Sequence, residues 1–275
     1  MISGTLISYR AELRKLIAQR RTWLGIATAA LVPVIFLISI QISKVTPHDG
    51  PYDTPLGANL RHSGLAIDFV VLKLVAVIGP TLIAALVAGD IVASEDMAGT
   101  LKTILVRSLR RGEILAGKVL ALFTYLAAAL LAYTVVGEVT GIIFWGFHPL
   151  TNLSGDSISA PHALALTVPS LVLYGIPVLA IASFGLFLSV VTRHSVAAIA
   201  GTLLYALALQ GLAALSALAS IRAFLLTTQL SAWHDLFQTP TAGDAIVRSL
   251  WVSALFAIPP LLAAWIVFQR RDVAT

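Results

Sequence analysis

The sequence has no cysteine and very few charged residues. Without cysteine this chain forms no disulfide, holds no thiolate metal site and has no cysteine nucleophile. Aspartate, glutamate, lysine and arginine make up only 11% of the 275 residues, whereas a soluble domain usually carries about 25%. Hydrophobic residues make up 58%, and the mean hydropathy is +0.93. Since a water-soluble fold cannot hide that much apolar surface, the composition predicts a membrane protein.

Several apolar runs are long enough to cross a bilayer as helices, which takes about 20 residues each. We expect an all-α membrane protein, because unpaired backbone is not tolerated in lipid and these runs are too long for barrel strands. The fourth run contains Pro169 and Pro177, which predict kinks. The predicted transmembrane helices are residues 23–42, 65–92, 114–146, 163–191, 196–221 and 250–268.

Most of the 18 lysines and arginines lie on one side of these spans. By the positive-inside rule that side is cytoplasmic, so both termini are predicted in the cytoplasm, in agreement with six crossings. The pI of about 9.7 is therefore interpreted as a topology signal and not as nucleic-acid binding. The first apolar run is a full span, so we expect no cleavable signal peptide. The basic side carries Arg10, Arg14, Lys15, Arg20, Arg21, Lys102, Arg107, Arg110, Arg111, Lys118, Arg193, Arg270 and Arg271.

Two segments outside the spans have patterns of their own. Residues 1–22 predict an amphipathic helix on the cytoplasmic membrane surface, with basic residues opposite an apolar stripe. Residues 222–248 are too polar to span yet rich in apolar side chains, so we predict short re-entrant or capping helices on the outer side. The apolar stripe of the first segment consists of Leu6, Tyr9, Leu13, Leu16 and Ile17.

Five of the six histidines fall on the outer side. A metal site is conceivable there, for instance His48 with Asp49, Asp53 and His62. No pair has the spacing or tight clustering of a metal site, so we expect solvated loop histidines and no metal or cofactor in this chain. The five are His48, His62, His148, His162 and His234.

The stretch "RRGEILAGKVLA" contains Gly112, Gly117 and Lys118 at the spacing of a nucleotide-binding P-loop. A working P-loop follows a buried strand and has serine or threonine after the lysine. Here Val119 follows, the preceding segment is basic, and the next residues enter a membrane span. We interpret the match as accidental and expect a non-catalytic chain.

The region from Gly89 onward resembles the cytoplasmic loop between spans two and three of type-2 ABC transporter permeases. That loop has an acidic residue, then Gly-Thr-Leu, a leucine pair, a basic residue and, later, Gly-Lys. Ser108-Leu109 stands here where the family often has a proline. The similarity extends to chain length, number of spans and the surface helix. The matching residues are Glu95, Gly99, Thr100, Leu101, Ile104, Leu105, Arg111, Gly117 and Lys118.

The resemblance implies that residues 95–111 form a coupling helix that docks on a separate ATPase subunit. The chain would be the permease of an exporter in the cytoplasmic membrane of a prokaryote. It would pair with a second permease subunit, identical or different, and with two ATPase subunits that bind ATP and Mg²⁺. Its apolar spans suit hydrophobic or amphipathic cargo such as a drug, antibiotic, peptide or lipid. The expected ATPase-coupling residues are Glu95, Asp96, Gly99, Thr100, Leu101, Ile104, Leu105, Arg107, Arg110 and Arg111.

Two charged residues within the predicted spans stand out, because an intramembrane charge is costly and usually paired or hydrated. At ~1.5 Å per residue, Lys73 and Glu138 both lie roughly 25–30 Å from the cytoplasmic side. Two interpretations stay open: a salt bridge that braces an outer gate or faces the pathway, or separate snorkelling to the outer interface. Gly137 and Gly141 have the G-x-x-x-G spacing that permits close helix packing.

Other functions are weighed against the exporter. An ion-coupled secondary transporter usually has acidic residues near the midplane or paired broken helices in an internal repeat, and we recognise neither. A membrane-embedded hydrolase would use Ser154 near Asp156, but these lie in an outer loop. A membrane anchor or assembly subunit also remains open. An ATPase gene beside this one would favour the exporter.

Overall fold

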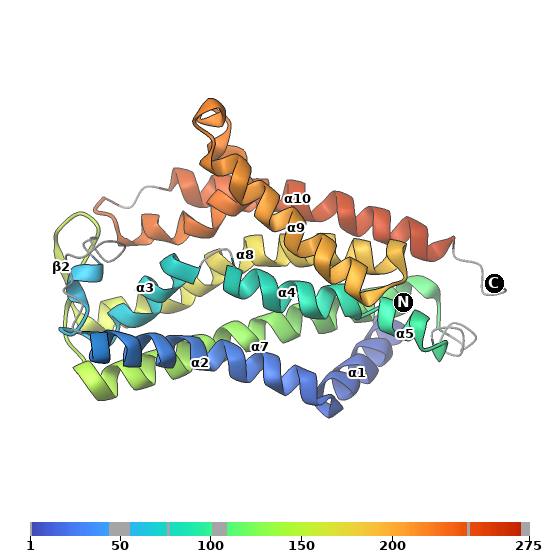
Figure 1. The fold of residues 1–275 in the computed structure, drawn as a ribbon, viewed down its shortest axis with the longest axis horizontal. Coiled ribbons are helices and arrows are strands. Elements are labelled where there is room, and N and C mark those ends of the chain that lie inside the picture. The colour runs from blue at the N-terminus through green and yellow to red at the C-terminus, as the bar shows by residue number, and fades with distance from the viewer. Residues whose placement is uncertain (1, 44–55, 76–77, 101–108, 241–242, 271–275) are drawn as a thin grey trace.

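The structure is a computed structural model that describes residues 2–43, 56–75, 78–100, 109–240 and 243–270. It is an elongated bundle of helices (Figure 1). The N-terminal helix α1 (Ile2–Ala18), the short helix α5 (Ala93–Met97) and the C-terminus lie at one end of the bundle. The short helix α3 (Ala66–Val75) lies toward the opposite end. Both termini therefore share one end, as an even number of crossings requires.

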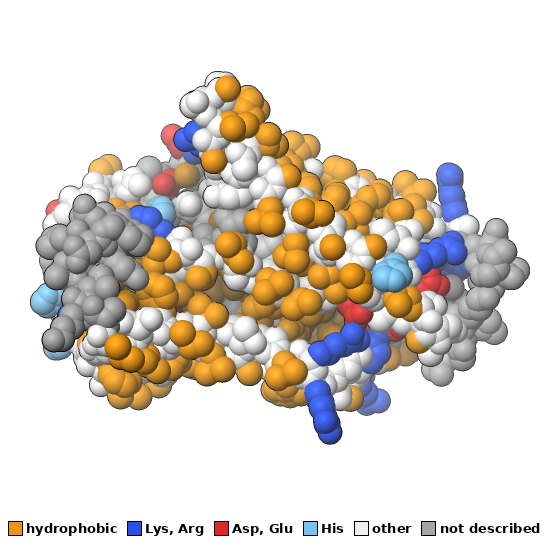
Figure 2. Space-filling view, viewed as in Figure 1, with side chains coloured by type: hydrophobic (Ala, Val, Ile, Leu, Met, Phe, Trp, Pro, Cys, Tyr) orange, Lys and Arg blue, Asp and Glu red, His pale blue; other side chains and the backbone are white. Residues whose placement is uncertain are grey.

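Six spans in the described part of the chain are long and apolar enough to cross a membrane, one of them being α4 together with α5. This confirms a multi-pass, all-α membrane protein. Hydrophobic side chains cover the middle of the bundle, and basic side chains gather near α1 and α5 (Figure 2). The long helices are α2 (Arg20–Ser43), α4 (Ile78–Asp90), α7 (Arg111–Trp145), α8 (Ala160–Thr192), α9 (Ser195–Ala214) and α10 (Asp244–Gln269).

The described part of the second predicted span forms two helices, α3 and α4. Residues 76–77 between them lie outside the described residues. Pro80 falls in the first turn of α4, where its missing N–H costs no helical hydrogen bond. The Gly79-Pro80 pair is thus the sequence signal for a helix start that hydropathy alone did not reveal.

The fifth predicted span, residues 196–221, is longer than the helix in the structure. Its helix α9 ends at Ala214 and Leu215 is extended, although the apolar run continues to Ile221. Short 3-10 helices follow: η3 (Ser216–Leu218), η4 (Arg222–Phe224) and η5 (Leu226–Phe237). Short helices were expected only from residue 222 onward.

The helix η5 covers the end of the bundle at which α3 lies. Phe69 of α3 packs against Trp233 and Phe237 of η5, with ring centroids 5.7 Å and 4.5 Å apart. A small antiparallel hairpin lies at the same end. Its strands are β1 (Leu150–Thr151) and β2 (Ser157–Ile158), and the turn η2 (Gly57–Asn59) binds β1 through Asn59.

The Gly137 and Gly141 spacing does allow close packing on α7. A Cβ atom on Gly64 would lie 2.1 Å from the carbonyl carbon of Gly141, so the two backbones are in contact. The N–H of Gly64 also donates to the carbonyl of Gly146 at 2.9 Å. Any side chain at Gly141 would separate the start of α3 from α7.

Candidate functional site

The helix α1 turns a stripe of small and polar residues toward the bundle. Ser8 and Glu12 are buried one helical turn apart, and the Ser8 hydroxyl donates to the carbonyl of Ile114 in α7 at 3.2 Å. Leu6 and Ile17 are 44% and 59% exposed. The predicted helix is therefore present, but polar side chains make part of its protein-facing surface and part of its apolar stripe faces outward.

Gly117 lets α1 approach α7 closely. A Cβ atom there would lie 2.4 Å from the Ser8 Oγ and 2.7 Å from the backbone nitrogen of Tyr9. The second of these atoms belongs to the backbone and cannot rotate away. The glycine of the Gly-Lys pair is therefore a packing residue between the first helix and α7.

Lys118 is completely buried, with 0% of its side chain exposed, and it is fully partnered. Its Nζ lies 2.8 Å from the carboxylate of Glu12 and 2.6 Å from that of Glu95, and it donates to the carbonyl of Ile91 at 3.1 Å. Lys15 contacts the same two carboxylates, at 2.7 Å for Glu12. We call Glu12, Lys15, Glu95 and Lys118 the ion cluster. Its two positive and two negative charges balance, as buried charges require.

The groups of the ion cluster on α1 are held in their charged forms. Burial opposes the ionised form of Glu12, but Lys118 and Lys15 outweigh it and hold the pKa of Glu12 below its usual range. Burial likewise opposes the charged form of Lys15, yet Glu12 and Glu95 raise the pKa of Lys15 above its usual range. Both ions therefore persist at neutral pH.

The short helix α5 is held from several sides. The Ser189 hydroxyl of α8 accepts from the backbone N–H groups of Val92 and Ala93 at 3.2 Å and 3.0 Å. Asp96 lies 3.8 Å from the guanidinium of Arg193, at the end of α8. Together with the ion cluster, these contacts join α5 to α1, α7 and α8, so a displacement of α5 is passed to three other helices.

The predicted coupling residues divide into two groups. Glu95 and Asp96 belong to α5, and Gly99, with φ +69°, takes the left-handed conformation that ends this short helix. The Thr100 hydroxyl donates back to the carbonyl of Glu95 at 3.2 Å. A single helix over residues 95–111 is therefore wrong, because α5 stops at Met97. Leu101, Ile104, Leu105 and Arg107 lie outside the described residues.

The basic residues after this segment belong to the start of α7. The backbone N–H of Arg110 donates to the Glu113 carboxylate at 3.0 Å, which satisfies a free donor at the helix N-terminus. Arg111 donates to the carbonyl of Gln269 at the end of α10, at 2.8 Å. Arg111 thus ties α7 to α10 in addition to any contact with a partner.

Gly117 and Lys118 both lie inside α7, where helical hydrogen bonds use their backbone N–H groups. They are not free to cradle a phosphate. In the described part of the chain, the only strands are β1 and β2, at the other end of the bundle. The P-loop spacing is accidental, as predicted.

Of the two interpretations open for Lys73 and Glu138, the salt bridge is not found among the described ion pairs. Glu138 accepts a hydrogen bond from Thr167 of α8 at 2.5 Å instead. Lys73 is exposed and lines a cavity of about 470 Å³ with Arg222. Asp68 of α3, unlike Lys73, contacts α7, and so does its neighbour Ile67. At about 100° per residue, five positions along a helix turn Lys73 well away from Asp68.

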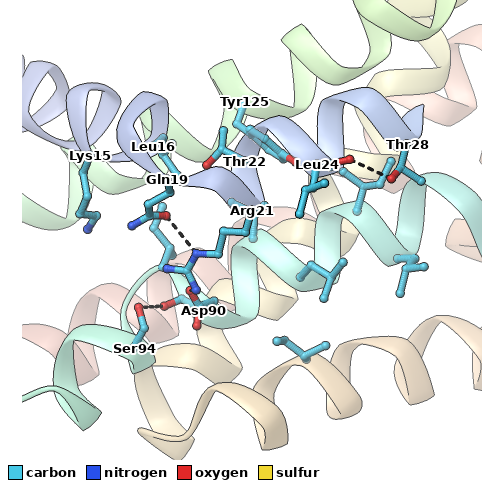
Figure 3. A pocket seen from close by; sticks show the side chains of 17 residues that line it. Lys15, Leu16, Gln19, Arg21, Thr22, Leu24, Thr28, Asp90, Ser94 and Tyr125 are labelled. Atoms are coloured by element: carbon cyan, nitrogen blue, oxygen red, sulfur yellow. Dashed lines mark hydrogen bonds and ion pairs between the residues drawn. The ribbon is translucent and has the colours of Figure 1, made fainter. Parts of the chain in front are cut away.

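A groove runs along α2 beside α4 (Figure 3). Its first part is a cavity of about 390 Å³ at the elbow between α1 and α2, where Arg21 pairs with Asp90 and binds Gln19 at 3.0 Å. Its second part, about 180 Å³, is lined almost entirely by apolar side chains. The two parts share Thr28, Leu82 and Ile83. The groove therefore has a part with charged residues, beside Arg21 and Asp90, and an apolar part.

His234 departs from the expectation of a solvated loop histidine. Its ring packs edge-on against Trp233, with centroids 4.1 Å apart, and burial together with the charge of Lys73 lowers the pKa of His234 to about 4. His62, His148 and His162 are exposed. Within the described residues, no group of three histidine or acidic side chains is arranged to hold a metal ion.

A family model described as "Protein of unknown function (DUF2705)" matches residues 28–274. The match covers most of the chain, and the chain belongs to this family. No curated protein matches it.

Proposed function

We propose that this member of the DUF2705 family is the membrane-spanning permease subunit of an ATP-driven exporter of the type-2 ABC class. The observation that carries the proposal is the ion cluster. It fastens Glu95, at the start of the segment similar to a coupling loop, to Lys118 of α7 and Glu12 of α1. A partner that pushes on this segment would move α5, α7 and α1 together, which is the behaviour of a rigid-body switch.

The ion cluster also gives a physical meaning to the motif that carries the resemblance. The acidic residue and the lysine of the motif form an ion pair, Glu95 with Lys118. Gly117, the glycine before that lysine, has no side chain and lets α1 pack closely on α7. The motif is then a clamp between a loop and two helices, and not a nucleotide site. ATP and Mg²⁺ would be bound by two separate ATPase subunits.

The proposed topology places the end of the bundle with the ion cluster in the cytoplasm of a prokaryote. Both described chain ends lie there (Figure 1), as do basic side chains of α1 (Figure 2). A second permease subunit, identical or different, would complete the pathway. The segment from η4 to the start of α10 would then cap or re-enter the membrane on the outer side.

The groove supports hydrophobic or amphipathic cargo, such as a drug, antibiotic, peptide or lipid. One part of the groove offers apolar walls from α2 and α4, and the other offers the charged pair Arg21 and Asp90. A ligand with a polar head and an apolar tail fits this groove, with its head beside Arg21 and Asp90 and its tail in the apolar part. Multidrug efflux belongs to the same proposal.

The test is co-purification of the chain with co-expressed ABC ATPase subunits from the same organism, followed by ATP turnover in proteoliposomes with candidate amphiphiles. Lys118→Met and Glu95→Gln are expected to remove the stimulation by amphiphiles. Arg222→Gln, an exposed cation far from the ion cluster, is the matched control and keeps it. ATP hydrolysis by the isolated chain, or failure of any ATPase to associate, contradicts the proposal.

An ion-coupled secondary transporter is the second candidate, and one observation favours it. Asp68 is buried within the second predicted span, close enough to Glu138 for their charges to interact. Uptake by the purified chain in liposomes, driven by a pH gradient without ATP, would support this candidate over the exporter. For the hydrolase alternative, the Ser154 hydroxyl accepts from the backbone N–H of Thr239 at 2.9 Å, which is a turn contact and favours no catalysis.

A further inference from the structure

Asp68 is a buried acid without a partner. It is 1% exposed, and neither carboxyl oxygen has a hydrogen-bond partner among the described residues. Its Oδ1 rests on the face of α7 at Gly137, where a Cβ atom would lie 1.8 Å from that oxygen. The carboxyl group therefore occupies the space that a side chain at Gly137 would fill.

Among the described residues, no positive charge compensates Asp68. Glu138, the residue after Gly137, interacts with Asp68 electrostatically and would repel a carboxylate. Tyr133 donates to the main-chain carbonyl of Asp68 at 2.9 Å, which leaves the carboxyl group untouched. Within the described residues, no lysine or arginine pairs with Asp68.

The surroundings of Asp68 determine which cation its carboxyl group can bind. A buried carboxylate without partners is strongly disfavoured against its protonated form. A metal cation such as Ca²⁺ needs six to eight oxygen ligands, and Mg²⁺ needs an octahedral set. In the described part of the chain, Asp68 belongs to no group of three or more histidine or acidic side chains that could hold a metal ion. A proton is the cation that fits this site.

We propose that Asp68 is a proton-binding site that carries a proton while α3 packs on α7 and releases it when the two helices separate at Gly137. The close backbone contact between Gly64 and Gly141 holds the loaded state. Separation would admit water to the carboxyl group and allow it to ionise. Opening of this end of the bundle is thereby linked to release of one proton, with about a tenfold change in the opening equilibrium per pH unit.

The other titratable groups on the elements around α3 do not replace this proton. On α2 the only titratable residues, Arg20 and Arg21, stand at the opposite end of the helix. Glu138 accepts a hydrogen bond from Thr167, and the Tyr133 hydroxyl donates to the main-chain carbonyl of Asp68. Among the described residues, the titratable groups that contact α3 or interact with its charges are Tyr133 and Glu138 of α7 and His234 of η5.

The test uses the purified full-length protein in detergent at neutral pH and needs no ATPase, so its outcome is separate from that of the exporter proposal. Dicyclohexylcarbodiimide reacts with a protonated carboxyl group: the carboxyl oxygen bonds to the central carbon and the proton moves to nitrogen. We expect mass spectrometry to find the adduct on Asp68, with at least a tenfold excess over the exposed Asp156. Labelling should fall as the pH is raised.

Infrared spectroscopy gives the second measurement. We expect the carbonyl band of a protonated carboxylic acid in the wild type, its loss in Asp68→Asn and its retention in the control Asp156→Asn. Absence of labelling and of the band at neutral pH overturns the proposal. Protection of Asp68 by Na⁺ at constant pH overturns it in favour of a metal cation. If Asp68→Asn does not fold, labelling of the wild type decides.

Discussion

The buried ammonium group of Lys118 lies 2.6 Å from a carboxylate oxygen of Glu95, so α7 is joined directly to the short helix that ends the preceding span. Glu12 contacts the same ammonium group from α1 at 2.8 Å. One side chain therefore connects three segments that are far apart in the sequence.

Replacement of Lys118 by methionine should destabilise the protein strongly. Two buried carboxylates would keep only Lys15 as a partner, and breaking a buried ion pair in this way costs about 3–5 kcal/mol. The exposed pair of Arg193 with Asp96, at 3.8 Å, is the comparison, and Arg193→Gln should cost less than about 1 kcal/mol. Denaturant unfolding in detergent measures both. Equal effects would show that the ion cluster is not a structural clamp.

A methyl group at Gly117 should loosen α1. We expect Gly117→Ala to lower the free energy of unfolding by about 1–3 kcal/mol, because overpacking forces the backbone of Tyr9 to move. Gly211 of α9 has no atom within 4 Å of its Cβ position, so Gly211→Ala should be neutral or stabilising by up to about 1 kcal/mol. Thermal unfolding compares the two. Equal changes in the melting temperature for Gly117→Ala and Gly211→Ala would contradict close packing of α1 at Gly117.

Acidification should weaken the cap formed by η5. The pKa of His234 is lowered to about 4 by burial and by Lys73, whereas an exposed histidine has about 6.5. The folded state therefore prefers the neutral ring, and the stability it contributes is complete above pH about 6.5 and lost as the pH falls toward about 4. His234→Gln should make the melting temperature less dependent on pH across this window. The exposed His162→Gln should retain the wild-type profile.

Lys73 and Glu138 should behave as independent sites. Because the two share no described contact, the effects of Lys73→Gln and Glu138→Gln on stability should add within about 0.5 kcal/mol. Exchange of the two charges should not restore export lost by either single reversal. A double-mutant cycle with a coupling well above this limit would restore the salt bridge as the better interpretation.

A bulky residue in the groove should block cargo. Ile83 lines both parts of the groove, so Ile83→Trp is expected to lower the stimulation of ATP turnover by amphiphiles at least tenfold. Ile143 of α7 is 73% exposed on the outside of the bundle, and Ile143→Trp supplies the same side chain away from the groove. Equal activity of both variants would exclude the groove as a cargo site.

The sequence predicts the long helices well because hydropathy is a local property. Gly79 and Pro80 also indicate the start of α4. The prediction of the second span rests on the length of the apolar run and does not use them. The contacts of α3 were not predictable in this way. Whether Asp68 or Lys73 faces α7 depends on where α3 sits, and both residues fall in the same apolar run.

The apolar stripe of α1 does not reveal which face of the helix meets the bundle, for a physical reason. In a soluble protein an apolar stripe marks the buried face, but a membrane protein also meets an apolar medium on its outside. Small residues are then the better indicator, because they allow helices to approach. Gly4 and Ser8 on α1 and Gly117 on α7 follow this rule, and Glu12 continues their stripe.

Both carboxylates that hold Lys118 precede it in the chain, and this order has a consequence for biosynthesis. When ribosomal synthesis delivers α7 to the insertion machinery, Glu12 and Glu95 have already emerged and await their counterion. A nascent polypeptide arrested before residue 118 retains one ammonium group, from Lys15, for two acids. The arrival of Lys118 is therefore the moment at which the ion cluster becomes electrically neutral.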